Sequence, residues 1–299
     1  MRKRVSQASM KDRIPKSTSF EFLDYHSHDD PKPGPEISVK SDAFWSYCGP
    51  LLSGPEDMPS NLDDWSAASL SSPLLPLLLP FLAFANAFIA QQGLDHYWVT
   101  IRATKATGEF DQPRWHTDDL FFSADGSGGL RAPAGEKKKK TPLPTKRRKL
   151  DLQTDWKLCT TLLGPSTMFI PSAHQARARE TQRTTKRALA TDHACTSIRC
   201  LGCAATAEAV RSRLADELAP LGRAQAASGA CAFFRIGEDG GAVHSEPGMG
   251  RGDRIFVNVV PGRRDELGRL MTTWGMGFPR AWWIAPAVPS GREAGLWKY

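Results

Sequence analysis

The chain lacks the apolar segment near its start that a secretory signal needs. A basic stretch, Met1 to Arg4, is present, but polar, charged and proline residues stand where the hydrophobic part would have to begin. No disulfide framework is therefore expected, and we predict that the six cysteines are reduced thiols. These cysteines are Cys48, Cys159, Cys195, Cys200, Cys203 and Cys231.

A long uninterrupted apolar run is also missing. The stretch 74–90 approaches membrane-spanning length, but Pro76 and Pro80 interrupt its first half. Three phenylalanines recur within it at helical spacing: Phe81, Phe84 and Phe88. We therefore predict a buried helix from Pro80 to Gln92 and no association with a membrane.

The chain has little of the cysteine patterning that structural zinc requires. One Cys-x-x-Cys pair, Cys200 and Cys203, follows His193 and Cys195. Structural zinc sites generally combine two such pairs, or one pair with two spaced histidines. The second half is missing here, so a zinc cluster is only the weaker interpretation of these residues.

Positive charge is concentrated in two segments. The net charge is +7, of which segment 131–149 supplies +8 and segment 1–16 supplies +5, leaving −6 for the rest of the chain. An acidic body argues against nucleic-acid binding by the folded part. Two clusters in the first segment resemble a two-part nuclear import signal: Lys137, Lys138, Lys139, Lys140, Lys146, Arg147, Arg148 and Lys149. We expect a nuclear or cytoplasmic protein that uses an import receptor in the first case, the alternative being a solvated charged loop.

The composition along the chain predicts one domain preceded by a tail. Residues 1–40 are polar, charged and proline-rich, which predicts a disordered tail. Residues 41–299 form the domain, with flexible insertions expected at 123–150 and 174–192. Apolar alternation predicts strands at 97–103, 231–236 and 255–260, and helical periodicity predicts helices at 205–218 and 263–271. The glycine-rich turn 237–241 predicts a hairpin between 231–236 and the segment that begins at Ala242.

A possible metal-binding motif lies at His116 and Asp118. Side chains two positions apart on an extended segment project from the same face, so both could reach one ion, whereas Asp119 should face away. A distant histidine would complete two imidazoles and one carboxylate, the set that leaves half of an octahedral Fe(II) open. Trp115 and the apolar residues after Asp119 favour a core-facing position, where an unpaired charge is costly.

The third ligand is expected to be His244. It follows a glycine-rich turn, whereas His174 and His193 lie in polar sequence without an adjoining apolar strand. Arg254 comes ten residues later and opens an apolar strand, so it could point inward and bind an acidic cosubstrate through two hydrogen bonds.

This order of parts, H-x-D, a late histidine and an arginine about ten residues on, resembles the Fe(II)/2-oxoglutarate-dependent dioxygenase superfamily. The chain is also similar to uncharacterised fungal proteins with an H-x-D motif, a G-P-x-T turn and a late histidine. The resemblance extends from about residue 98 to about residue 261. Many members have a small hydroxyl residue two positions after the arginine, where this chain has Phe256.

The resemblance implies a mostly β, α+β fold with a double-stranded β-helix or jelly-roll core and flanking helices. It makes His116, Asp118 and His244 the ligands of Fe2+, and Arg254 the anchor of 2-oxoglutarate. Lys157 and Thr160 are expected across the barrel, within reach of the cosubstrate. The implied activity is hydroxylation or demethylation of a substrate that the sequence does not identify.

Two other functions are compatible with the same sequence. The barrel could be a nuclear interaction module without catalytic activity, which would contain no metal. It could also be a cupin-like hydrolase in which Zn(II) activates water and no keto acid is needed. The sequence predicts neither the substrate nor the oligomeric state.

Overall fold

Ten strands and five α-helices make up the described part of the computed structural model, which comprises residues 18–25, 37–108, 111–122, 151, 153–190, 201–250 and 252–284. The strands are β1 (Phe20–Asp24), β2 (Ala43–Pro50), β3 (His96–Thr104), β4 (Trp156–Leu163), β5 (Met168–Phe169), β6 (Ala224–Gln225), β7 (Ala230–Arg235), β8 (His244–Ser245), β9 (Arg254–Gly262) and β10 (Arg280–Ile284). The helices are α1 (Asn61–Ser69), α2 (Leu75–Gln91), α3 (Gln175–Ala188), α4 (Leu201–Leu218) and α5 (Arg264–Thr273). The expectation of a mostly β, α+β fold is confirmed.

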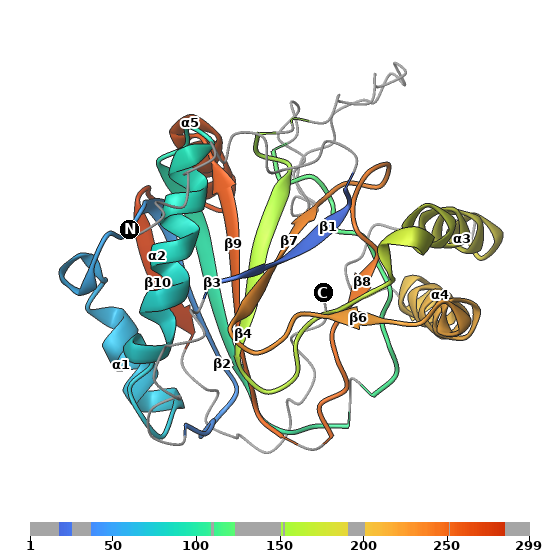
Figure 1. Ribbon diagram of the computed structural model, residues 1–299, viewed down its shortest axis with the longest axis horizontal. Coiled ribbons are helices and arrows are strands. Elements are labelled where there is room, and N and C mark those ends of the chain that lie inside the picture. The colour runs from blue at the N-terminus through green and yellow to red at the C-terminus, as the bar shows by residue number, and fades with distance from the viewer. Residues whose placement is uncertain are drawn as a thin grey trace, which may run out of the picture.

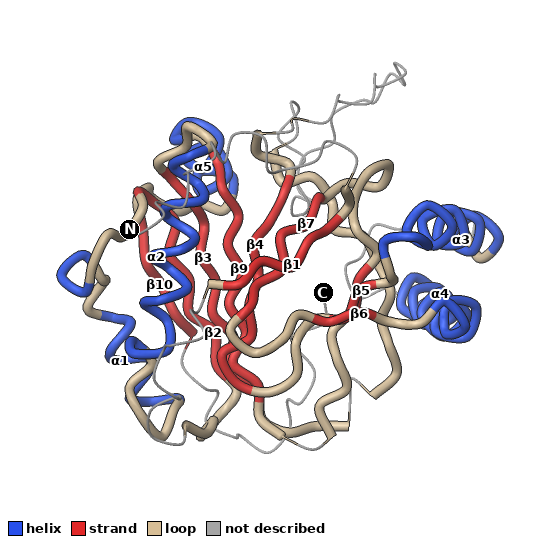
Figure 2. Tube along the Cα trace, viewed as in Figure 1, coloured by secondary structure: helices blue, strands red, loops and turns tan. Residues whose placement is uncertain are grey.

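The strands form two antiparallel sheets. The larger has seven strands in the order β1-β7-β4-β9-β3-β2-β10, and the smaller has three in the order β6-β5-β8. In Figure 1 the smaller sheet lies between the larger sheet and helices α3 and α4, whereas α1 and α2 lie on the other side of the larger sheet. Figure 2 shows the same layers as a tube. Among the described helices, none combines the length and the apolar character that a membrane span requires.

Alternate residues of the larger sheet face different layers. Leu158 points outward and packs in one buried cluster with Phe81 of α2. Its neighbour Cys159 points inward and packs against Phe169 of the smaller sheet. Because side chains alternate along a strand, this single register gives β4 an apolar outer face and an inner face that is free to carry polar groups.

The apolar helix is longer than its sequence signals predict. We expect it to begin at Pro80, whereas α2 begins at Leu75 and contains Pro80 in its interior. An interior proline lacks a donor and crowds the carbonyl four residues earlier. Leu78, Phe81 and Ile89 are fully buried against the sheet, and this apolar burial offsets the cost of the proline.

Part of the expected N-terminal tail is ordered. Residues 20–24 form β1, which pairs with β7 at the edge of the larger sheet. Phe20 is buried and stacks on Phe169 with ring centroids 4.7 Å apart. The prediction of disorder is therefore wrong for this stretch, because two alternating phenylalanines outweigh the polar composition around them.

The expected insertion at 174–192 is largely helix α3. Its four buried residues are Gln175, Ala178, Gln182 and Thr185. They recur at helical spacing, but three of them are polar, so no apolar periodicity marks the helix in the sequence. The other expected insertion, 123–150, lies outside the described residues.

The two strands that flank the turn at residues 237–241 belong to different sheets, β7 to the larger and β8 to the smaller. The Ala242 amide donates to the Arg235 carbonyl at 2.9 Å, as in a hairpin. The chain then leaves β7, and His244 of β8 pairs with Phe169 of β5. Local sequence predicts both strands here, but it does not specify the sheet that each one joins. The other predicted strands and helices, matched by β3, β7, β9, α4 and α5, are confirmed.

Candidate metal centre

His116 and His244 lie on neighbouring backbone segments that exchange two hydrogen bonds. Each amide donates to the other residue's carbonyl, with both N···O distances at 2.9 Å. This pairing points both side chains to one face, and the ring centroids are 4.4 Å apart. The segment around His116 was expected to be extended, and in the described structure its strand pairing is limited to this one bridge.

Asp118 completes a compact group of three side chains. Its Oδ1 lies 3.7 Å from His116 Nε2, and its Oδ2 lies 3.7 Å from His244 Nε2. One ligand atom from each of the three residues lies within 4.8 Å of the other two. This spacing suits a single divalent cation bound at ordinary metal–ligand distances after small side-chain shifts. Asp119 is exposed and lies outside the group, as expected.

Both imidazoles have the tautomer that metal binding requires. His116 Nδ1 lies 2.7 Å from the Arg114 carbonyl oxygen, and His244 Nδ1 lies 2.9 Å from the Ala242 carbonyl oxygen. A carbonyl can only accept, so each Nδ1 carries a proton, and each Nε2, the nitrogen that faces Asp118, is the atom that can ligate a metal when the ring is neutral. Backbone carbonyls that orient ligating histidines in this way are common around protein-bound metals.

The electrostatics of the group favour ionised Asp118 and neutral His244. Burial alone would raise the pKa of Asp118, but Lys157, His244 and His116 together hold it below its usual value. Burial, with the nearby His116, lowers the pKa of His244. The His116 side chain is 37% exposed and that of His244 is 9% exposed, so the group opens to solvent on the His116 side.

Arg254 is buried on the inner face at the start of β9. Its Nε donates to the Pro165 carbonyl at 3.0 Å, and its Nη2 donates to the Thr167 hydroxyl at 3.1 Å. Burial lowers the pKa of Arg254 to about 10, so the guanidinium is charged at neutral pH. Both hydrogen bonds go to uncharged oxygens, which leaves donors available for an acid. Gly164, with φ at +83°, permits this turn because a Cβ there would meet the Asp253 carbonyl oxygen.

Glu246 is a site residue that our sequence analysis missed. It stands two positions after His244, so it projects to the same face of that segment. Burial would raise the pKa of Glu246, but His116, His244 and Arg254 outweigh burial and lower it. A second carboxylate therefore lies within electrostatic reach of both the histidines and Arg254. The two-residue period from His244 is the signal that could have identified it.

A small cavity adjoins the three-residue group. It is lined by Cys159, Thr160, Thr161, Ser166, Thr167, Phe169, Ala226 and Ala232. The proposed ligands and Arg254 do not line it, but two lining residues contact them: Phe169 stacks on His244 at 5.7 Å between centroids, and Thr167 binds Arg254. The cavity has room for about one water molecule, roughly 10 Å³, so a larger ligand requires the surrounding side chains to move.

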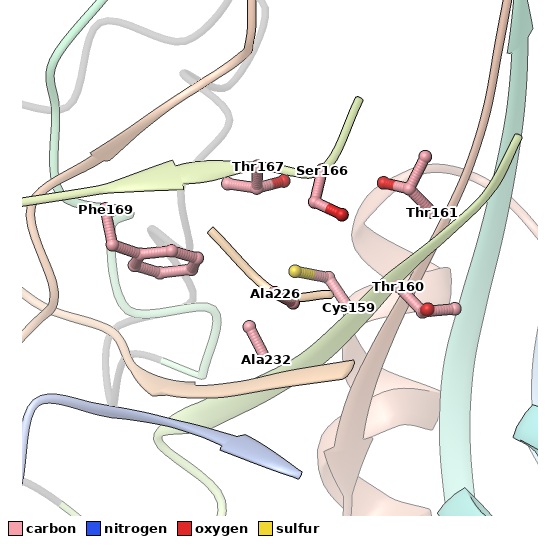
Figure 3. Close-up of a pocket in the computed structure, with 8 residues that line it drawn as sticks. All are labelled: Cys159, Thr160, Thr161, Ser166, Thr167, Phe169, Ala226 and Ala232. Carbon is pink, nitrogen blue, oxygen red and sulfur yellow. The ribbon is translucent and has the colours of Figure 1, made fainter. Parts of the chain in front are cut away.

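Lys157 and Thr160 lie on different faces of β4. The Lys157 ammonium reaches the site and lies 2.8 Å from Asp118 Oδ2. Figure 3 shows the Cys159 sulfur directed into the cavity and the Thr160 side chain on the opposite side of the strand. The Thr160 hydroxyl is hydrogen-bonded to Tyr25 and to the Ala230 carbonyl, each at 3.1 Å. Thr160 is thus one residue out of register with the inner face, and its hydroxyl is bound to Tyr25 and Ala230, although the residue contributes to the lining of the cavity. Contact between Thr160 and a cosubstrate stays a prediction.

Two glutamines of α3 bind residues next to the two histidines. Gln175 Nε2 donates to the Ile170 and Val243 carbonyls at 2.6 and 3.2 Å, and Gln175 Oε1 accepts from the Val243 amide at 2.7 Å. Gln182 Nε2 donates to the Thr117 hydroxyl at 3.3 Å. These contacts fix the residues next to His244 and His116, so α3 supports the geometry of both histidines.

Other candidates from the sequence do not bear on this site. His174 lies in a short 3-10 helix and is exposed. The eight residues of the basic clusters, together with His193, Cys195 and Cys200, lie outside the described residues. Cys159 is a buried inner-face residue, and burial raises the pKa of its thiol to about 11. It is therefore a neutral thiol rather than a thiolate ligand.

Comparison with known proteins adds no family assignment. No model of a known protein family matches the chain, and no curated protein matches its sequence. The resemblance to Fe(II)/2-oxoglutarate-dependent dioxygenases therefore rests on the H-x-D motif, the late histidine and the arginine alone. The chemistry of these residues has to support any functional assignment.

Proposed function

We propose that this protein is an oxygenase that uses Fe(II) and 2-oxoglutarate. The observation that carries the proposal is the convergence of His116, Asp118 and His244, with both Nε2 atoms directed at one carboxylate. Two imidazoles and one carboxylate on one side of an ion are the ligands of non-haem Fe(II) oxygenases. Bound Fe(II) would supply the redox chemistry, in which dioxygen and 2-oxoglutarate yield succinate, carbon dioxide and a hydroxylated substrate.

The strand order supports a double-stranded β-helix as the core. From β3 onward the chain alternates between sheets: β3 in the larger, the His116 bridge beside β8 in the smaller, β4 in the larger, then β5 and β6 in the smaller. It returns to the larger sheet with β7, crosses with β8 and returns again with β9. Such repeated crossing between two facing antiparallel sheets is expected of a jelly roll. The ligands then lie at the segments that face each other inside it.

The buried charges favour a dianionic cosubstrate. Lys157 and Arg254 are formally positive, and Asp118 and Glu246 are negative, so the protein groups balance. A divalent cation would leave the site with two positive charges, which a dicarboxylate neutralises. In this arrangement Arg254, which keeps unused donors, would bind the carboxylate distant from the metal. Phe256, whose ring lies 4.4 Å from the Arg254 guanidinium carbon, would hold that guanidinium by stacking rather than add a hydroxyl contact.

Turnover of the cosubstrate tests the proposal. Protein reconstituted with Fe(II) is expected to convert 2-oxoglutarate slowly to succinate in air, and to bind 2-oxoglutarate without oxygen in calorimetry. Arg254→Met should weaken that binding by about 100-fold, because a buried charge-assisted contact is lost, while metal binding persists. A protein that binds Fe(II) but neither binds nor consumes 2-oxoglutarate would contradict the proposal. Protein that purifies without metal and binds none would instead indicate a non-catalytic interaction module.

Glu246 favours one second candidate, a metal-dependent hydrolase. A carboxylate beside the metal ligands could take a proton from a water bound to Zn(II), and the small cavity would admit water more readily than a keto acid. If the Zn(II)-loaded protein hydrolyses a test substrate at the same rate with and without oxygen, that result would support this candidate over the oxygenase. Oxygen-dependent release of succinate would exclude it.

A further inference from the structure

Lys157 is a buried lysine whose charged partner is a proposed metal ligand. It is 8% exposed, and its ammonium lies 2.8 Å from Asp118 Oδ2. Two aromatic rings also lie near it, with Nζ 4.6 Å from the centroid of Phe121 and 6.0 Å from that of Phe234. A buried ammonium is costly unless it is paired, so this contact is the main stabilising interaction of the lysine.

The same carboxylate faces both imidazoles. Asp118 Oδ1 is 3.7 Å from His116 Nε2, and Asp118 Oδ2, the oxygen held by Lys157, is 3.7 Å from His244 Nε2. A dication bound among these three residues would lie close to the ammonium and repel it. The dication would also draw away the negative charge that stabilises the lysine in the core.

We propose that Lys157 is the internal counter-ion of Asp118 in the metal-free protein, and that it competes with the metal for this carboxylate. Lys157 is thus a positioning residue that keeps the ligand set ordered before loading and limits the affinity of the loaded state. The inference rests on the metal site of the proposed function. It implies an order of events, because the ammonium becomes available to an anionic cosubstrate only after the metal has taken Asp118.

Removal of the ammonium should therefore tighten metal binding. In Lys157→Met the metal-free protein retains a buried carboxylate without its partner, which is destabilising. The metal relieves that penalty, so the metal-loaded variant loses much less stability. A lysine that only supported the fold would destabilise both states equally and leave the metal affinity unchanged.

The experiment measures Mn(II) affinity by anaerobic calorimetry, and melting temperature with and without Mn(II), for four proteins. Lys157→Met should melt earlier than wild type without metal, bind Mn(II) about tenfold tighter or more, and show a larger metal-induced rise in melting temperature. Lys157→Arg, which retains the charge, should bind Mn(II) much as wild type does. Arg235→Met is the matched control, since Arg235 is also a buried cation and its side chain shows no contact with the three-residue group in the described structure. Whatever its effect on stability, it should leave the Mn(II) affinity unchanged.

Unchanged or weaker Mn(II) binding by folded Lys157→Met would overturn the inference, and so would equal tightening in Arg235→Met. If Lys157→Met does not fold without metal, recovery of its fold on titration with Mn(II) supports the inference, and failure to recover overturns it. The proposed function fails separately, if wild type and Lys157→Met both bind no metal. Binding by Lys157→Met alone would support the competition directly.

Discussion

The two faces of the larger sheet differ in what their residues do. On the outer face, Leu158 and Val259 pack against α2 in the main apolar cluster. On the inner face of the same strands, Lys157 contacts Asp118 and Arg254 contacts Thr167. Neighbouring residues along one strand thus belong to a core or to a candidate site according to their register. We therefore expect that substitutions one residue apart can change either the stability of the fold or the binding properties of the candidate site.

The largest effect is expected when a proposed ligand is removed from the inner face. His244→Ala should reduce metal affinity by more than about 100-fold. Loss of a residue that only orients a metal ligand already costs up to about 100-fold, and loss of the ligand itself should cost more. The fold should persist, since His244 forms its strand pair through backbone atoms. Metal content after reconstitution and calorimetry with Fe(II) without oxygen measure the effect.

His174→Ala is the control for that variant, because His174 is exposed and is not part of the three-residue group. It should bind metal as wild type does. Equal loss of metal in the two variants would mean that a histidine outside the described group contributes to binding. Retention of metal by His244→Ala would remove the basis of the candidate centre.

An outer-face substitution should have the opposite effect. Leu158→Ala removes a fully buried side chain from the cluster under α2 and should lower the free energy of unfolding by about 2–5 kcal/mol. The metal affinity of the folded protein should stay as it is, because Leu158 points away from Asp118. Denaturant unfolding, followed by metal titration at low temperature, measures both quantities. A large change in metal affinity would show that the two faces are coupled through β4.

The same periodicity explains how much of the molecule could be predicted from its sequence. Strands β3 and β9 and helices α4 and α5 have strong apolar patterns, and local patterns are sufficient for elements that bury one apolar face. The three proposed ligands were also predictable, because residue type and spacing limit which side chains can share a metal. Helix α3 was not, because three of its four buried residues are polar: Gln175 binds backbone, Gln182 binds the Thr117 hydroxyl and Thr185 binds the Glu217 carboxylate.

Parts of the site depend on tertiary structure that no local pattern specifies. Whether β8 stays with β7 or joins β5 decides if His244 meets His116, and the turn before it is compatible with either. The contact between Lys157 and Asp118 joins two segments that are distant in the chain. Glu246 and Thr160 differ from these, because the two-residue period of a strand predicts their faces. It places Glu246 on the same face as His244 and Thr160 on the face opposite Lys157.

The smallest effect is expected from a substitution of Asp119, which lies next to the proposed ligand Asp118 but faces solvent. Asp118 faces both imidazoles, whereas Asp119, one residue later, is exposed. Asp119→Asn should therefore leave metal affinity unchanged and alter the free energy of unfolding by less than about 0.5 kcal/mol, as is usual for surface substitutions. Asp118→Asn makes the same chemical change on the inner face and should abolish tight metal binding, because a neutral amide is a poor ligand and leaves Lys157 without its counter-charge. Both variants lose one negative charge from the same dipeptide. Metal titration of the two in parallel therefore distinguishes the effect of side-chain orientation on metal affinity from the effect of net charge. A similar loss in both would mean that general negative charge near His116, rather than ligation by one oriented carboxylate, attracts the cation.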